Sequence, residues 1–194
     1  MKLSLDLTYN TPPEWAHFVL ENFDRFLQDH ADCERKASSM AMSFIAKCPE
    51  KTEIIPELIE TALEELEHFQ DVYKLMESRG IQLAKEMEKD PYIEQLMKAV
   101  RSNPEDRLLD RMVLASIIEC RGAERFRLIA DALEDPELKA FYKQLWVSEA
   151  KHGHIFVKLA LMYWDEKEVY ERLEVLNKIE GEICSQLKWR HALH

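Results

Sequence analysis

Two sets of carboxylate and imidazole side chains recur along this chain with almost the same spacing. Each set is one glutamate followed by a Glu-x-x-His pair: Glu34 with Glu65 and His68, then Glu119 with Glu149 and His152. A glutamate from each of two helices and a Glu-x-x-His pair from each of two others form the ligand set of a dinuclear iron site in a four-helix bundle. Hard oxygen donors and two imidazoles hold ferrous or ferric ions and leave open positions for dioxygen. The sequence therefore predicts two iron ions that carry out redox chemistry with O2.

The spacing inside each set is what two antiparallel helices require. The single glutamate precedes its pair by 31 residues in the first set and by 30 in the second. Residues three apart share one face of a helix, and about 15 residues lead from a central metal to the end of such a helix. Helix breakers stand near both midpoints, at Cys48-Pro49 and Asp135-Pro136. We therefore expect two helical hairpins.

The helix signals extend this prediction to the whole chain. After an extended start of about ten residues, the expected helices run from about Thr11 to Ala46, Ile55 to Arg79, Pro104 to Leu133, Pro136 to Trp164 and Glu166 to Lys188. Roughly 23 residues separate the second helix from the third, with a helical piece broken at Asp90-Pro91. One long crossover between two hairpins is the ferritin-like topology. The predicted fold is all-α, a ferritin-like four-helix bundle with a long crossover and an additional C-terminal helix.

Composition sets the class of protein. A chain of 194 residues with 46% hydrophobic content and only four glycines suits one almost wholly helical domain over residues 1–194. The four cysteines are isolated, and the N-terminus lacks a long apolar core, which together predict a cytoplasmic location. The longest apolar stretches fall short of the 18 or so residues that span a membrane, so no membrane association is expected.

Two further residues compete for roles at the site. Glu124 rivals Glu119, but five residues of separation place the two about 140° apart on a helix, and only Glu119 keeps the repeat spacing. We therefore predict Glu119 as the ligand and Glu124 as a residue that forms a salt bridge or supports the site. His30, one turn before Glu34, either hydrogen-bonds a ligand or contacts substrate, or is a buried core histidine.

The segments around these residues resemble a known family. Residues 29–38, 64–69, 118–126 and 148–152 are similar to the tRNA hydroxylases of the MiaE family, and the similarity extends from about Leu7 to Trp164. The resemblance implies a non-haem di-iron monooxygenase that uses O2 to hydroxylate the isopentenyl group of 2-methylthio-isopentenyladenosine beside the anticodon of tRNA. It also implies that the six residues of the two sets are the iron ligands. No flavin or nicotinamide fingerprint is present, so an external electron-transfer protein is expected.

A tRNA partner requires a local basic surface, because the formal net charge of the chain is −11. The candidate contacts are Arg121, Arg125, Arg127, Lys151, Lys158 and the segment 188–191. Apolar residues that are candidates to hold the prenyl group are Phe23, Leu27, Met112 and Phe126. Their simpler role is core packing.

Two other classes of protein share part of this pattern. A ferritin-like or rubrerythrin-like oxidase or peroxidase would use the same six ligands on a small substrate. A helical interaction module without metal would explain the helices and the charge, but not the repeated ligand sets. The sequence leaves the electron donor, the particular tRNAs, the oligomeric state and the choice between two irons and an iron–manganese pair open.

Overall fold

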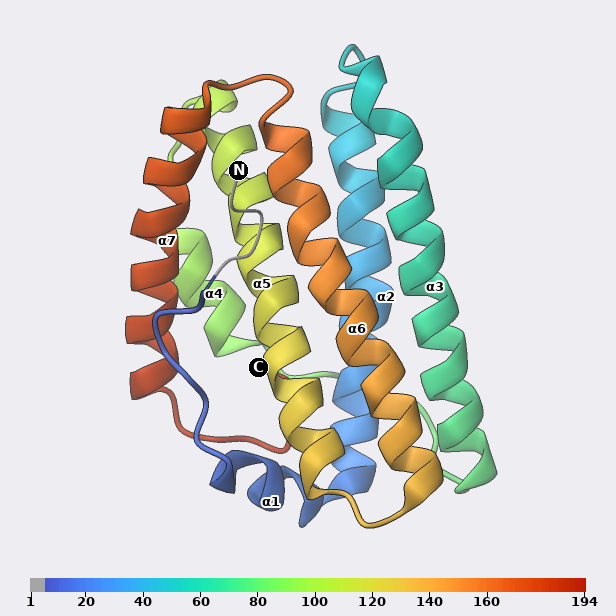
Figure 1. Ribbon diagram of the computed structural model, residues 1–194. Coiled ribbons are helices and arrows are strands. Elements are labelled where there is room, and N and C mark those ends of the chain that lie inside the picture. The colour runs from blue at the N-terminus through green and yellow to red at the C-terminus, as the bar shows by residue number, and fades with distance from the viewer. Residues whose placement is uncertain (1–5) are drawn as a thin grey trace. The chain divides into compact units, whose positions relative to one another are not determined.

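The computed structural model describes residues 6–194, and all regular elements in that range are helices (Figure 1). The elements are α1 (Glu14–Leu20), α2 (Phe23–Lys47), a 3-10 turn (Thr52–Ile54), α3 (Ile55–Ser78), α4 (Pro91–Lys98), α5 (Pro104–Ala132), α6 (Pro136–Ala160) and α7 (Glu166–Gln186). The predicted all-α class is confirmed. Within residues 6–194, each helix is too short or too polar to cross a membrane. The expected extended start is non-helical over residues 6–10, and its first five residues lie outside the described range.

Side-chain caps fix where several helices begin. Asp90, Asn103 and Asp135 each accept a hydrogen bond from a backbone N–H in the first turn of the helix that follows. A proline follows each cap, where its missing N–H costs nothing. The prediction that Asp90-Pro91 breaks a helical piece was wrong, because this pair opens α4.

The first long helix was also predicted wrongly, as one helix from about Thr11 to Ala46. The chain turns at Glu21 and Asn22, between α1 and α2. The side-chain oxygen of Asn22 accepts a hydrogen bond from the backbone N–H of Arg25 at 3.3 Å, which supplies a start for α2. An asparagine that can cap a helix is neutral or unfavourable inside one, so the break has a local cause.

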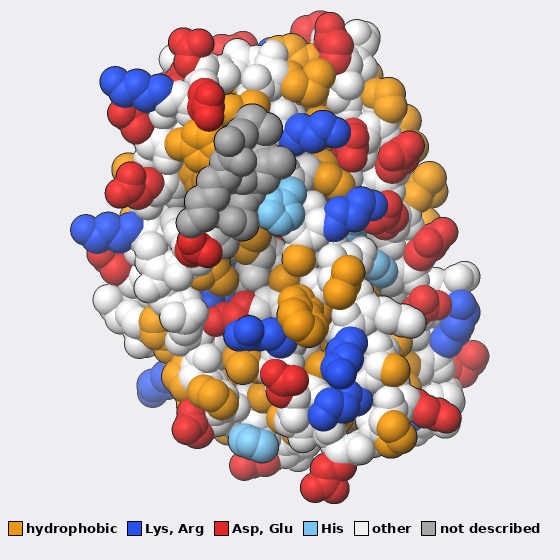
Figure 2. All heavy atoms as spheres, in the orientation of Figure 1, with side chains coloured by type: hydrophobic (Ala, Val, Ile, Leu, Met, Phe, Trp, Pro, Cys, Tyr) orange, Lys and Arg blue, Asp and Glu red, His pale blue; other side chains and the backbone are white. Residues whose placement is uncertain are grey.

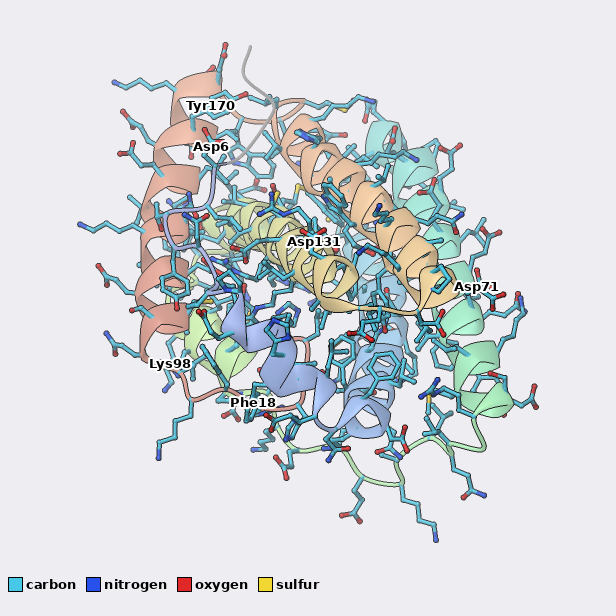
Figure 3. The ribbon with its side chains drawn as sticks, turned by 60° about the horizontal axis from the view of Figure 1, so that its bottom comes forward. Asp6, Phe18, Asp71, Lys98, Asp131 and Tyr170 are labelled. Carbon is cyan, nitrogen blue, oxygen red and sulfur yellow. The ribbon has the colours of Figure 1, made fainter. Side chains whose placement is uncertain are left out.

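The described chain divides into two compact units. The first consists of residues 18–88 with 190–193 and is built on the antiparallel hairpin of α2 and α3 (Figure 1). The Ser38 hydroxyl donates to the carbonyl of Ala62 at 2.8 Å, between the two helices. The C-terminal residues close this unit, since the N–H of Leu193 donates to Asp29 at 2.8 Å. The His191 ring stacks on Phe18, which Figure 3 labels on α1.

The second unit consists of residues 6–17, 89–189 and 194 and is built on the hairpin of α5 and α6, with α4 and α7. Between α5 and α6, the Ser116 hydroxyl donates to the carbonyl of Gly153 at 2.6 Å. The N-terminal segment lies along α7, where the Thr8 hydroxyl donates to the carbonyl of Asn177 at 2.8 Å. Our assignment of residues 1–194 to a single domain stays a prediction.

Candidate metal centre

The α2–α3 hairpin brings together the three members of the first ligand set. Glu34 projects from α2, and Glu65 and His68 project from α3, with one ligand atom from each lying within 4.8 Å of the others. The Nδ1 atom of His68 is 3.5 Å from a carboxylate oxygen of Glu65 and 3.8 Å from one of Glu34. Both glutamates are buried, whereas the His68 side chain is 15% exposed. We call these three residues the first half-site.

The α5–α6 hairpin does the same for the second set. Glu119 projects from α5, and Glu149 and His152 project from α6, again with one ligand atom from each within 4.8 Å of the others. The Nδ1 atom of His152 is 3.6 Å from a carboxylate oxygen of Glu149, and all three residues are buried. We call these residues the second half-site. Two helical hairpins thus carry the same trio of two carboxylates and one imidazole.

His30 contacts the first half-site directly. Its Nε2 atom lies 2.6 Å from Oε1 of Glu34, and the His30 side chain is fully buried. Of the roles considered from the sequence, the structure supports hydrogen bonding to a ligand candidate. A buried carboxylate held by an imidazole has its orientation fixed before any metal arrives.

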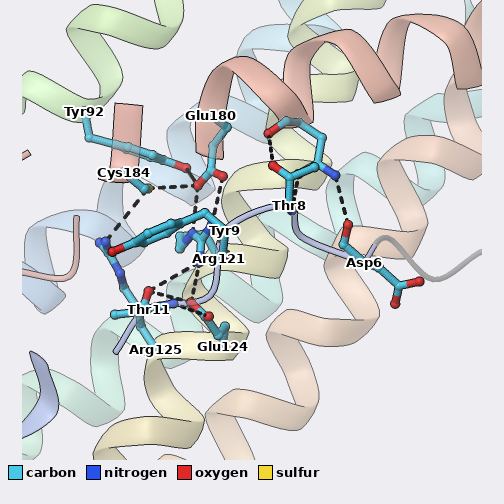
Figure 4. Close-up of polar contacts among 11 residues, drawn as sticks. Asp6, Thr8, Tyr9, Thr11, Tyr92, Arg121, Glu124, Arg125, Glu180 and Cys184 are labelled. Carbon is cyan, nitrogen blue, oxygen red and sulfur yellow. Dashed lines mark hydrogen bonds and ion pairs between the residues drawn. The ribbon is translucent and has the colours of Figure 1, made fainter. Parts of the chain in front are cut away.

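Glu124 takes the role predicted for it as a salt-bridging residue. Its carboxylate accepts hydrogen bonds of 2.7 Å from both the backbone N–H and the hydroxyl of Thr11, and it pairs with Arg121. Figure 4 shows these contacts as part of a polar network of the second unit, whereas Glu119 belongs to the second half-site. The two acids therefore lie in different clusters of side chains.

The centre of that network is Arg121, which the sequence had suggested as a tRNA contact. Its guanidinium is fully buried and donates to both carboxylate oxygens of Glu180, at 2.7 and 2.8 Å (Figure 4). Burial alone would lower the pKa of Arg121, but the hydrogen bonds and charge of Glu180 raise it above its ordinary range. Arg125 is buried too, with its guanidinium 5.0 Å from the centre of the Trp15 ring. These two arginines are therefore not surface contacts, and that prediction was wrong.

The other suggested tRNA contacts lie at or near the surface. Exposed among them are Arg127, Lys151, Lys158, Lys188 and Trp189. Arg190 and His191 are half-buried, and Arg190 lies 3.9 Å from Asp29. Leu27, Met112 and Phe126 are buried and Phe23 is half-buried, and their contact with a prenyl group stays a prediction.

One structural feature of the site was missed from the sequence. Gly153, next to His152, packs so closely on α5 that an added Cβ would lie 2.6 Å from the sulfur of Cys120. Real Cβ atoms do not approach other atoms so closely, so glycine is what lets α6 approach α5 at the second half-site. A glycine in the middle of a predicted helix, beside a predicted ligand, was the available signal.

The chemistry of the two half-sites fits iron. Carboxylate oxygens and imidazole nitrogens are the donors that iron takes in oxygen-activating sites. Four buried carboxylates are costly unless a cation or hydrogen bonds compensate their charge, and iron would do so.

Comparisons with known proteins identify relatives of this chain. The model of the family described as "tRNA-(MS[2]IO[6]A)-hydroxylase (MiaE)" matches residues 3–194. A tRNA 2-(methylsulfanyl)-N(6)-isopentenyladenosine(37) hydroxylase from Pseudomonas putida is 36% identical over 173 residues, which cover 89% of this chain and 83% of that protein. The hydroxylase of the same name from Salmonella typhimurium is 30% identical over 131 residues, which cover 68% of this chain and 47% of that protein.

One solved structure has the same fold as this chain. It is described as "Protein 43 with aldehyde deformylating oxygenase activity from Synechococcus" and matches with a TM-score of 0.91 and 31% identity, over 97% of this chain and 94% of that one. This likeness confirms the predicted ferritin-like fold. Together with the two hydroxylases and the family match, it leads to one conclusion: the chain belongs to the MiaE family of tRNA hydroxylases.

Proposed function

We propose that this protein is a di-iron monooxygenase that hydroxylates the isopentenyl group of 2-(methylsulfanyl)-N6-isopentenyladenosine in tRNA, with O2 as co-substrate. The observation that carries the proposal is the repeated trio of two buried carboxylates and one imidazole, one trio on each helical hairpin. The relationship to tRNA hydroxylases supplies the substrate class.

The residues that would hold the two irons are Glu34, Glu65 and His68 with Glu119, Glu149 and His152. When bound, the iron pair supplies the activation of dioxygen that insertion into a carbon–hydrogen bond requires. Within the protein, His30 holds the carboxylate of Glu34 in one orientation. Burial of the four carboxylates keeps bulk water away from them, which strengthens their attraction for a cation.

Electron balance requires a partner. One oxygen atom of O2 enters the alcohol and the other leaves as water, so two electrons and two protons must be supplied for each turnover. We propose an external electron-transfer protein as the donor, and the cytoplasm, where tRNA is modified, as the location.

The test of this proposal is chemical analysis of tRNA. Nucleosides from cells that lack the gene should contain the prenylated adenosine without its hydroxyl group, and the wild-type gene should restore the hydroxylated form. A gene carrying Glu149→Ala should not restore it, although the protein accumulates. An unchanged nucleoside profile on deletion would reject the tRNA substrate.

The structural relative with aldehyde deformylating oxygenase activity points to the competing substrate class. Purified iron-loaded protein should therefore be supplied in parallel with an aldehyde and with hypomodified tRNA, using the same reductant. Turnover of the aldehyde alone would place the protein among oxygenases of small substrates.

A further inference from the structure

The outward face of α6 is basic in a protein that is otherwise strongly acidic. Between Glu137 and Asp165 the only carboxylate in the sequence is Glu149, and Glu149 is buried in the second half-site. The same segment contains four lysines: Lys139, Lys143, Lys151 and Lys158. The net charge of the whole chain is −11, so a helix whose surface lacks acids beyond its first turn departs sharply from the overall composition.

These lysines form a row along the helix. At about 100° per residue, Lys143, Lys151 and Lys158 fall within a sector of roughly 80°, and all three are exposed. A rise of 1.5 Å per residue separates Lys143 from Lys158 by about 22 Å. Lys139 lies one turn before Lys143 and is half-buried at the edge of the row. We call these four residues the lysine face.

The lysine face also carries apolar surface. Val147, between Lys143 and Lys151, is 66% exposed. Figure 2 shows Lys and Arg side chains with hydrophobic side chains between them on the side where α6 runs in Figure 1. Lys151 directly precedes His152, which points inward from the same turn, so the row passes the level of the second half-site.

We infer that the lysine face binds the phosphate backbone of the tRNA substrate and holds it at the level of the second half-site. This inference rests on the proposed function. Lysine ammonium groups are compact point charges that pair with single phosphates, and such contacts position a nucleic acid without reading its sequence. A row of four lysines on a helix whose one glutamate between Lys139 and Lys158 is buried suits a strand whose charges repeat along its length. An acidic protein surface is the competing occupant, and the experiment below distinguishes the two.

The experiment reverses two charges of the face. Lys139→Glu/Lys143→Glu changes two positions in the N-terminal half of α6, which lie nine and thirteen residues before His152 and at least six before Glu149, so the half-site sequence is intact. The matched control is Lys167→Glu/Lys178→Glu on α7, which makes the same change in net charge at two exposed lysines of the same unit. Lys139→Gln/Lys143→Gln removes the two charges without adding acids and serves as the milder variant. Iron content and helicity are measured for each protein.

Binding of hypomodified tRNA is then measured by fluorescence anisotropy at several salt concentrations. We expect Lys139→Glu/Lys143→Glu to bind tRNA roughly ten-fold more weakly than wild type, and the glutamine variant to show an intermediate loss. For Lys139→Glu/Lys143→Glu, the slope of the logarithm of the binding constant against the logarithm of the salt concentration should be smaller in magnitude by about two. The α7 control should bind within about two-fold of wild type. Hydroxylation of tRNA should show a raised KM with little change in kcat.

Other results have distinct meanings. If both α6 variants keep the wild-type affinity for tRNA and the wild-type KM, and the wild-type protein hydroxylates tRNA, the lysine face does not bind tRNA. The proposed function is then unaffected. If the α6 variants bind tRNA as wild type does but lose turnover only when the electron-transfer protein is the reductant, the lysine face binds that protein and the inference is overturned. If the wild-type protein hydroxylates no tRNA, the proposed function itself is rejected.

Discussion

His30 and Glu34 are joined by a contact of 2.6 Å between Nε2 and Oε1, one helical turn apart in the interior of the protein. Partners that orient a ligand typically change metal affinity by about 10- to 100-fold when they are removed. We therefore expect His30→Leu to remain helical but to bind iron more weakly by about that factor, as measured by titration of the metal-free protein. His17→Leu, at an exposed position of α1, is the control. Unchanged iron affinity in His30→Leu would make His30 an ordinary core residue.

Glu119 and Glu124 should respond in opposite ways to the loss of their charge. Glu119→Gln should lose iron, because it removes a carboxylate of the second half-site. Glu124→Gln should retain iron but lower the free energy of unfolding by about 2 kcal/mol, since Thr11 and Arg121 lose a charged acceptor. Metal analysis and chemical denaturation provide the two measurements. Iron loss in Glu124→Gln with retention in Glu119→Gln would reverse the assignment.

The hairpins and the membership of each half-site were predictable because the necessary signals are local. A Glu-x-x-His pair shares a helix face whatever the rest of the fold does. The starts of α5 and α6 follow from Asn103-Pro104 and Asp135-Pro136, where the cap and the proline are adjacent in sequence. The separation of Glu119 from Glu124 required only the helical period.

The features that the sequence did not reveal depend on distant partners or on packing. Arg121 looked like a surface cation, and its burial depends on Glu180, which lies 59 residues later on α7, outside the repeat. No local pattern connects these two positions. The break at Asn22 rests on a single side-chain hydrogen bond, whose contribution is too small to identify from composition.

Gly153 offers a test of close packing at the second half-site. In Gly153→Ala the new methyl group would meet the Cys120 sulfur, so we expect a loss of about 1–3 kcal/mol in the free energy of unfolding. Cys120→Ala in the same chain should recover part of this loss, because it removes the nearest obstructing atom, while the Ser116 carbonyl at 3.3 Å still limits the fit. Gly122→Ala on α5 is the control, since an added Cβ there meets no atom within 4 Å. Equal losses in Gly153→Ala with and without Cys120→Ala would show that the sulfur is not the obstacle.

Asp110 should make stability depend on pH in the acid range. Its buried carboxylate accepts hydrogen bonds of 2.6 and 2.7 Å from Arg172 and of 2.8 Å from the backbone N–H of Arg101. Burial alone would raise the pKa of Asp110, but Arg172 and Arg101 together lower it below its ordinary value. The charged form is therefore favoured by folding.

A lowered pKa stabilises the folded state above the pKa of the unfolded chain, which is about 4, and this contribution disappears as the pH falls through the lower folded value. Asp110→Asn should thus unfold about 3 kcal/mol more easily than wild type at pH 7, because it leaves two arginines without their carboxylate. The difference between the two proteins should shrink as the pH falls below 4. Asp106→Asn is the control, since Asp106 pairs with Arg101 at the surface, where such pairs contribute 1 kcal/mol or less. Urea denaturation from pH 7 to pH 3 measures both variants, and a difference for Asp110→Asn that stays constant across this range would show that its charge is not what stabilises the fold.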